Sequence, residues 1–184
     1  MLLKIGHKPD HGFDEPLGLL QDCHRRIEHF LLTLITIAGD ASGRERGASQ
    51  RAQFERAIEY FATAAPRHTA DEEDSLFPRL RHTAEPATQQ LMERLAHDHA
   101  AADEHHHAVD RLGKRWLADG VLDEADYRQL SEHLRQLKAT YDEHIAAEDR
   151  ELFPAAARVL PAKDIEAIGR EMAARRQNTQ PGLS

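Results

Sequence analysis

The sequence has a single cysteine, Cys23, among its 184 residues. One thiol excludes a disulfide within the chain, and it excludes a structural zinc knot or an iron–sulfur cluster, since each needs several thiolates. Long apolar runs are also missing, because the longest one, residues 30–38, is too short to cross a bilayer. The first residues show no cationic segment followed by a long apolar stretch and a cleavage site. We therefore expect no signal peptide, no membrane partner and a cytoplasmic location.

Positive charge is scarce as well. The chain has 24 Lys and Arg against 32 Asp and Glu, which gives a formal net charge of -8. This balance argues against nucleic acid as a partner, because binding to a phosphate backbone needs a cationic surface. Histidine, by contrast, is abundant with 13 residues, and imidazole is a common metal ligand. The length predicts one domain with one core.

Glycine is infrequent and lies mostly where helices would end, and no alternation typical of strands persists. The sequence therefore predicts an all-α fold with four long helices and a short fifth one. The expected helices cover about residues 15–38, 49–80, 86–118, 123–153 and 163–176. Pro66 should kink the second helix, and Asp123 should cap the fourth. We expect a bundle over residues 1–160, a C-terminal helix packed on it at 161–176, and a disordered tail at 177–184.

The most informative pattern is a phrase that occurs twice. Residues 68–78 read HTADEEDSLFP, and residues 144–154 read HIAAEDRELFP. The His, the Glu four residues later and the final Leu-Phe-Pro recur at one constant offset. On a helix, residues four apart share a face, so each copy presents a nitrogen and an oxygen in one direction. Two copies facing each other would supply two nitrogens and two oxygens to a shared site, which suits a transition metal.

The duplication extends to the other two long helices, where His24 and His99 have similar flanking residues. Each half then contains a helix with one inward His, followed by a helix with His-x-x-x-Glu. Packed face to face, the two helical hairpins predict an antiparallel four-helix bundle with an internal twofold repeat. Apolar seams with spacings of three and four place all the candidate ligands in the core. The six predicted metal ligands are His24, His68, Glu72, His99, His144 and Glu148.

Burying these groups without partners would be costly, and metal ligation would remove that cost. The pattern resembles the hemerythrin-like family, also called HHE cation-binding domains, over about residues 17–154. The resemblance implies a four-helix bundle with a non-haem pair of iron ions, oxo- or hydroxo-bridged, with Glu72 and Glu148 as bridging carboxylates. By the same resemblance, His24 and His68 would bind one iron, and His99 and His144 the other. Zinc and manganese are alternative metals for these ligands.

The chain departs from the oxygen-carrying members of that family in two places. Those proteins have His-x-x-x-His on the third helix, whereas Leu95 and Asp103 lie four residues either side of His99 here. They also carry Asp on the fourth helix where this chain has Glu148. The departures predict open metal positions and argue against reversible oxygen carriage.

The expected function is therefore to bind, sense or reduce a small oxidant, namely oxygen, peroxide or nitric oxide. An alternative is a metal- or iron-responsive regulatory or interaction module without turnover. A zinc site would need fewer ligands than the six predicted here. Ferritin-like oxidases use Glu-x-x-His instead of His-x-x-x-Glu and rank lower for that reason. A homodimer is left open by the sequence.

Several acids near the ligands have more than one interpretation. Glu28 and Asp103 each follow an inward His by four residues, and could be further ligands, hydrogen-bond acceptors for the histidines, or solvated acids. Glu73 and Asp149, next to the expected bridging carboxylates, are interpreted as acceptors or surface groups.

The remaining candidates are mostly given structural roles. His97 is expected in solvent, and residues 105–107, three consecutive histidines, resemble an accessory metal patch in which His106 would hydrogen bond at the end of the bundle. Cys23 is interpreted as a small buried residue, although a redox role remains open. Tyr141 either packs in the core or donates a hydrogen bond toward the site. The fifth helix should cover one end of the bundle or bind a dimer partner.

Overall fold

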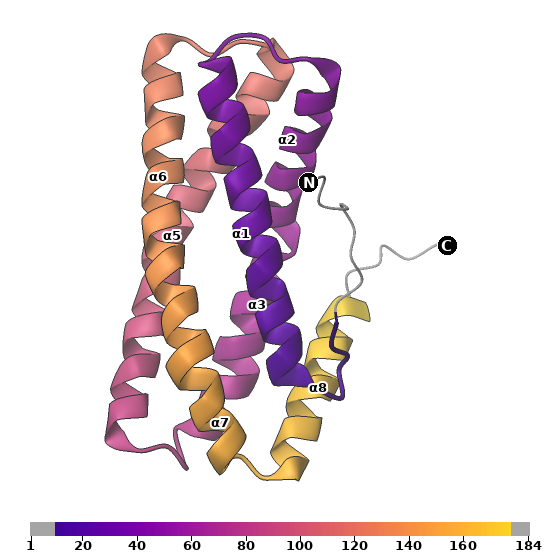
Figure 1. Ribbon diagram of the computed structural model, residues 1–184, viewed down its shortest axis with the longest axis vertical. Helices are drawn as coiled ribbons and strands as arrows, with labels where there is room; N and C mark the ends of the chain where they lie inside the picture. The colour runs from indigo at the N-terminus through magenta and orange to yellow at the C-terminus, as the bar shows by residue number, and fades with distance from the viewer. Residues whose placement is uncertain (1–9, 178–184) are drawn as a thin grey trace.

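The computed structural model describes residues 10–177, and every regular element in that range is helical (Figure 1). In chain order the elements are α1 (Pro16–Ala41), α2 (Ala48–Thr63), α3 (Ala65–Ala70), η1 (Asp71–Leu76), α4 (Phe77–Leu80), α5 (Pro86–Asp119), α6 (Glu124–Ala147), η2 (Glu148–Leu152), α7 (Phe153–Val159) and α8 (Ala162–Gln177). The long helices run along the long axis of the molecule, and α1 and α5 each pack against both α2 and α6. The predicted all-α helical bundle is confirmed.

One end of the bundle is closed by the two loops that join α1 to α2 and α5 to α6. Gly43 in the first loop has φ +76°, and its carbonyl oxygen accepts a hydrogen bond of 2.8 Å from the Leu122 amide of the second loop. A Cβ at this position would lie 3.1 Å from the Leu122 carbonyl oxygen. Glycine is therefore favoured both by the positive φ and by the close approach of the two hairpins.

The second long helix differs from the continuous one expected over residues 49–80. Helix α2 ends at Thr63, and α3 begins at Ala65, because Pro66 has no N–H and cannot continue the hydrogen-bond ladder. The chain then passes through the π-helical segment η1 before the short helix α4. The interruption is the single residue Ala64, whose dihedrals remain in the α region, so the distortion predicted at Pro66 is present.

A π-helical segment includes the Glu of each His-x-x-x-Glu motif. The Phe77 amide donates to the Glu72 carbonyl in η1, and the Phe153 amide donates to the Glu148 carbonyl in η2, in each case five residues back. A proline follows each phenylalanine, and its ring would clash with the carbonyl four residues earlier in an unbroken α-helix. The wider π turn relieves that clash, so the repeated Leu-Phe-Pro explains the repeated distortion.

The fourth long helix begins as predicted, because the Asp123 side chain accepts a 2.8 Å hydrogen bond from the Asp126 amide. Helix α8 covers the opposite end of the bundle, where it packs on η1 and α1 and buries Ile168 and Met172. Gln177, expected in a disordered tail, is the last residue of α8. The rest of that predicted tail, residues 178–184, lies outside the described residues.

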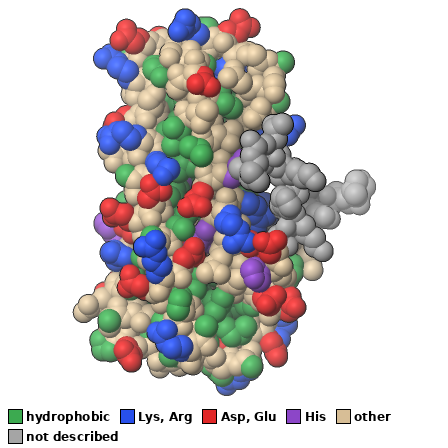
Figure 2. Space-filling model, in the orientation of Figure 1, with side chains coloured by type: hydrophobic (Ala, Val, Ile, Leu, Met, Phe, Trp, Pro, Cys, Tyr) green, Lys and Arg blue, Asp and Glu red, His purple; other side chains and the backbone are tan. Residues whose placement is uncertain are grey.

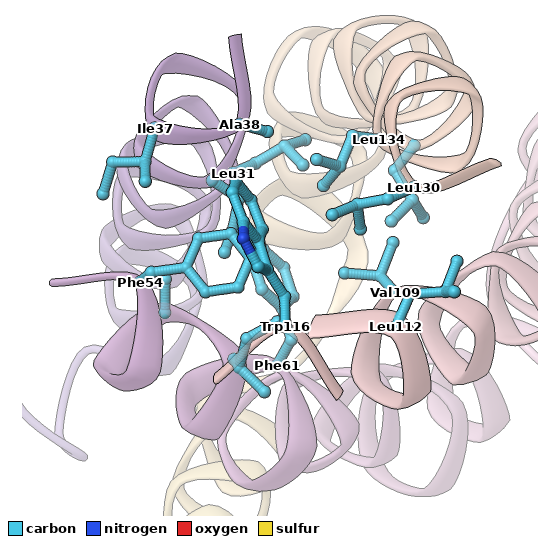
Figure 3. Packing of buried hydrophobic residues seen from close by; sticks show 14 of the residues in the cluster. Leu31, Ile37, Ala38, Phe54, Phe61, Val109, Leu112, Trp116, Leu130 and Leu134 are labelled. Carbon is cyan, nitrogen blue, oxygen red and sulfur yellow. The ribbon is translucent and has the colours of Figure 1, made fainter. Parts of the chain in front are cut away.

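The apolar interior is divided in two, where the length suggested one core. One cluster fills the end near the interhelical loops. There Trp116 packs against Phe54, and the same cluster includes Phe61, Leu112 and Leu130 (Figure 3). A second cluster joins the lower ends of α1 and α5 to α7 and α8. Along the chain, His24, His68, Glu72 and His99 lie between residues of the two clusters. His144 and Glu148 lie on either side of Ile145 and Ala147, where the chain passes from the first cluster to the second. A polar layer interrupts the core because charged groups occupy the seams at that level.

The surface gives no sign of one dominant charged patch on the face seen in Figure 2, where acidic and basic side chains are interspersed. Among residues 10–177, no helix combines the length and the apolar character needed to cross a bilayer.

The contact between α2 and α5 depends on Gly113. A Cβ built there would lie 2.5 Å from Ile58 Cδ1 and 3.3 Å from Phe54 Cε1. Since Phe54 is fully buried, we expect Gly113→Ala to lower the free energy of unfolding by about 1–3 kcal/mol, as overpacking does. Urea denaturation would measure this change.

Gly39, exposed near the end of α1, is the matched control. A Cβ there would meet nothing within 4 Å, so Gly39→Ala should stabilise the protein by about 0.5–1 kcal/mol. Equal effects of the two substitutions would contradict the close-packing argument.

Candidate metal centre

The structure brings all six predicted ligands together in the polar layer between the two apolar clusters. Five of them are at most 4% exposed, and the His99 side chain is 10% exposed. They form two overlapping groups whose ligand atoms lie within 4.8 Å of one another. Both groups contain Glu72 and Glu148. The first group adds His24 and His68, and the second adds His99 and His144.

Glu72 lies between the two pairs of histidines. One of its oxygens, Oε1, is 3.3 Å from His68 Nε2 and 3.9 Å from His24 Nε2. The other oxygen, Oε2, is 3.4 Å from His99 Nε2. The two oxygens of this carboxylate therefore face opposite members of the site, as a bridging ligand requires.

Glu148 occupies the matching place from the second half of the chain. Its Oε2 is 3.0 Å from His24 Nε2, and its Oε1 is 3.2 Å from His144 Nε2. The four imidazoles thus all direct Nε2 toward the two carboxylates. This arrangement follows the pseudo-twofold relation that the duplicated sequence predicts.

The other nitrogen of two histidines is held by an acid from the opposite half of the chain. His24 Nδ1 is 2.9 Å from Asp149 Oδ1, and His99 Nδ1 is 2.8 Å from Glu73 Oε1. Each acid directly follows a predicted bridging carboxylate in the sequence. Glu73 and Asp149 therefore act as hydrogen-bond acceptors that orient the imidazoles, one of the two roles expected for them.

The remaining two histidines have partners that the sequence reasoning missed. His144 Nδ1 faces Asp98 Oδ2 at 3.5 Å, whereas His68 lies against the thiol of Cys23. Cys23 directly precedes His24, and Asp98 directly precedes His99, so the two residues occupy equivalent places in the repeat. Alignment of the two halves of the sequence could have identified these two partners, because it pairs Asp98 of one half with Cys23 of the other.

The phenylalanines of the repeated motif also cross between the halves. Phe153 stacks on His24 with ring centroids 5.4 Å apart, and Phe77 stacks on His99 at 6.4 Å. Both phenylalanines are almost fully buried. Each Leu-Phe-Pro therefore places an aromatic ring against an imidazole of the other half and limits the access of water to it.

The electrostatics of the site favour charged forms in the absence of metal. Burial alone would lower the pKa of His24, but nearby carboxylates raise it well above its ordinary value. Burial would also lower the pKa of His99, but the neighbouring Glu72 carboxylate raises that pKa to about 9. Burial would raise the pKa of Glu72, but the surrounding histidines hold it well below its usual range. Protons on the imidazoles thus compensate the carboxylates where cations would otherwise do so.

Unpaired atoms provide the test of whether these residues fit a metal. Both carboxylate oxygens of Glu72 and of Glu148, together with His24 Nε2, are buried without a well-aligned hydrogen-bond partner in residues 10–177. Buried polar atoms normally have such partners, and leaving them unpaired is unfavourable. Their convergence on two points, with imidazole and carboxylate as the only donors, fits a pair of transition-metal ions.

The other candidates lie outside this set. Glu28 and His97 are exposed, which agrees with the solvated role considered for each, and Asp103 is exposed along α5. Cys23 is buried, as expected. Burial raises the pKa of its thiol, but contacts with His68 and a 3.1 Å hydrogen bond from Arg26 bring it below the ordinary value.

The histidines at 105–107 do not form the accessory metal patch that was predicted. His105 Nδ1 is 2.9 Å from His133 Nδ1, His106 Nε2 is 2.7 Å from the Tyr141 hydroxyl, and His107 is exposed. Successive residues on a helix point about 100° apart, so these rings diverge. His106 does form a hydrogen bond, but beside the core and not at the end of the bundle. Tyr141 packs against the core, which is one of the two roles considered for it in the sequence.

Comparison with known proteins identifies the family of the chain. The model of the hemerythrin HHE cation binding domain matches residues 15–156, which is most of the chain. An uncharacterised protein of Haemophilus influenzae is 28% identical over 166 residues, covering 90% of this chain and 92% of that protein. The match spans all six clustered residues and both hairpins of the bundle. The chain therefore belongs to the hemerythrin HHE cation-binding family.

Proposed function

We propose that this protein binds two iron ions between its two hairpins, and that it binds, senses or reduces a small oxidant there. The oxidant would be oxygen, peroxide or nitric oxide. The observation that carries the proposal is the set of four buried imidazoles and two buried carboxylates whose ligand atoms converge on two points. When bound, a ferrous pair supplies electrons and exchangeable coordination positions.

The chain's own residues would hold and shield that pair. His24 and His68 face one position, His99 and His144 face the other, and Glu72 lies between them. Asp149 and Glu73 fix the orientation of two imidazoles through Nδ1, which leaves Nε2 free for ligation. Leu95, four residues before His99, has no atom that could bind a metal, which supports an open position on the His99 side.

The test is to load the protein with iron(II) without oxygen, and to measure metal content and the optical spectrum before and after each oxidant. We expect a pair of irons per chain and new absorption bands after addition of oxygen, peroxide or nitric oxide. A spectrum that none of the three changes would overturn the oxidant role. Uptake of a single zinc in preference to iron would overturn the di-iron assignment. The cytoplasmic location and the homodimer stay predictions from the sequence alone.

The metal affinity should depend on pH in a defined direction. Ligation requires neutral imidazole, and His99 carries a proton below its pKa of about 9 in the metal-free protein. Binding therefore expels that proton, and the apparent affinity should rise about tenfold per pH unit for each proton displaced between pH 7 and 9. Above about pH 9 this dependence should level off. A chelator competition at several pH values measures it, and an affinity independent of pH would contradict protonated ligands.

A second candidate function is a metal-responsive interaction module. Asp71 directly precedes Glu72, and Arg175 and Arg176 of α8 form ion pairs with it. A shift of Glu72 on metal binding would therefore reach α8 through Asp71. Hydrogen exchange of metal-free and metal-loaded protein tests this function. Slower exchange in α8 after loading would support it, and equal exchange would count against it.

A further inference from the structure

A cleft of about 610 Å³ lies between α2 and α3 on one side and α5 on the other. Exposed residues such as Ala100 line it, so it opens to solvent. His99 and its partner Glu73 also line it, so the cleft reaches the proposed metal centre. The other five predicted ligands are at most 4% exposed, whereas 10% of the His99 side chain is accessible. A buried metal site needs a path by which ions enter, and this cleft leads to its least buried ligand.

The size of the cleft suits a hydrated cation. One water takes about 30 Å³, so the six waters around an octahedral ion occupy about 180 Å³. Such an ion fits in the cleft before any side chain replaces a water. It does not fit among the predicted ligands, because the ligand atoms of each group lie within 4.8 Å of one another. An ion that enters this way must therefore exchange its waters for protein ligands between the solvent and the centre.

Three residues of types that bind cations follow one stripe of α5 along the cleft. His99, Asp103 and His107 all line it, at intervals of four residues. Residues four apart share a helix face and lie about 6 Å apart along the axis. Side chains lean toward the N-terminal end of their helix, so Asp103 and His107 lean toward His99. The stripe thus offers an imidazole, a carboxylate and a second imidazole in succession toward the metal centre.

Asp103 and His107 are accessible to an ion that arrives from solvent. Both residues are exposed, and within residues 10–177 neither forms a hydrogen bond or an ion pair. Asp110, the next acid of α5 in the lining, differs from them because one of its oxygens is 2.8 Å from Lys114 Nζ. Asp103 and His107 are therefore the two that can exchange with the waters of an ion at little cost.

The charge of the lining also favours a cation. Its acids are Glu73, Asp103 and Asp110, and none of the described residues in it is Lys or Arg. A cleft lined by one sign of charge concentrates ions of the opposite sign and speeds their association. Low-dielectric walls, here including Phe61 and Val109, strengthen that effect. A neutral oxidant would gain nothing from these charges.

We propose that divalent metal ions enter and leave the centre through this cleft, and that Asp103 and His107 bind them transiently on the way to His99. The inference rests on the proposed function, because it concerns how the same site is filled. The competing route lies at the end of the bundle that α8 covers, where η1 would have to open. That route predicts that the cleft residues have no effect on the rates.

Stopped-flow absorbance with Co²⁺ and the full metal-free chain tests the proposal. Co²⁺ binds nitrogen and oxygen ligands more tightly than Fe²⁺ does, and it is coloured. Mixing the loaded protein with excess EDTA then measures release. A path affects the barrier and not the end states, so a path variant should slow uptake and release by one common factor. Its dissociation constant should stay unchanged, whereas loss of a ligand of the final site would raise that constant.

Three variants separate the cleft from the surface. Asp103→Asn should slow both rates about threefold, because it removes one of the three acids in the lining. Ala100→Phe, next to His99 at an exposed lining position, should slow both rates further by obstruction. Glu104→Gln, the matched control, removes an exposed acid that does not line the cleft, and it should change neither rate. Added salt should slow uptake by the unchanged protein more than uptake by Asp103→Asn.

Rates and equilibrium binding together distinguish the two proposals. If the chain holds metal but Asp103→Asn and Ala100→Phe have the rates of Glu104→Gln, the entry path is overturned and the metal centre stands. A higher dissociation constant for Asp103→Asn with an unchanged uptake rate would also overturn the path, since Asp103 would then be a ligand of the final site. If the chain binds neither Co²⁺ nor Fe²⁺ at equilibrium, the proposed function and the path fail together.

Discussion

Glu72→Gln is expected to abolish stable binding of the proposed pair of ions. The carboxylate oxygens face His68 at 3.3 Å and His99 at 3.4 Å, so one side chain serves both positions. Glutamine has nearly the same shape, but it is uncharged and replaces one acceptor oxygen with a donor. Loss of a hydrogen-bonding partner behind a ligand already costs about 10–100-fold in affinity, and loss of a shared ligand should cost more than about 100-fold. Metal content after removal of excess iron would measure the effect.

Glu143→Gln is the matched control for this prediction. It makes the same chemical change one residue from His144, but at an exposed position of α6. It should retain the metal content of the unchanged protein. Circular dichroism of both variants separates loss of metal from loss of helix. Retention of the full metal content by a folded Glu72→Gln variant would remove the basis for a shared bridging carboxylate.

The second large effect is expected where α8 holds the π-helical segment that carries Glu72. Asp71 is fully buried, and its two oxygens are 2.8 Å from Arg175 Nη1 and 2.7 Å from Arg176 Nη2. Replacing both arginines with alanine leaves a buried carboxylate with neither of these partners. We expect a loss of about 3 kcal/mol in the free energy of unfolding, the lower end of the range for a broken buried pair, because both arginines are partly exposed.

Urea denaturation of the double variant measures that loss, and two further variants test its origin. Arg170→Ala removes an arginine of the same helix whose partner Glu166 is also exposed, and it should change stability little. Adding Asp71→Asn to the double variant removes the unpaired charge and should restore part of the stability. A double variant as stable as Arg170→Ala would show that α8 contributes no electrostatic anchor to η1.

The candidate ligands could be found from the sequence because they repeat at a helical spacing. Burial of His24 and Glu72 in apolar seams is a local property, since each helix shows its inward face through its own period. The partners of the histidines could not be found in this way. His24 and Asp149 are 125 residues apart, and their contact depends on how the two hairpins face each other. The sequence repeat alone indicated that the two hairpins would face each other.

The helix breaks were missed for a different physical reason. Periodicity continues through Pro66 and Pro78, so a single helix with a kink at Pro66 was expected over residues 49–80. Proline removes one donor and clashes one turn earlier, and the chain can respond with a kink, a break or a π turn. The structure has a break before His68 and a π-helical segment that includes Glu72. The choice depends on packing against α5 and α8, which the local sequence does not contain.

The exchange of a carboxylate for a thiol between Asp98 and Cys23 makes the two halves chemically unequal. His144 Nδ1 faces the Asp98 carboxylate at 3.5 Å, whereas His68 lies against the Cys23 thiol, so the two proposed metal positions are expected to differ in affinity. A limited supply of metal would then enter the two positions in a fixed order. Protein given less than a full complement would consist mainly of one half-filled species, and not of a statistical mixture. The order of filling would then be set by one Asp-to-Cys difference between two otherwise similar halves.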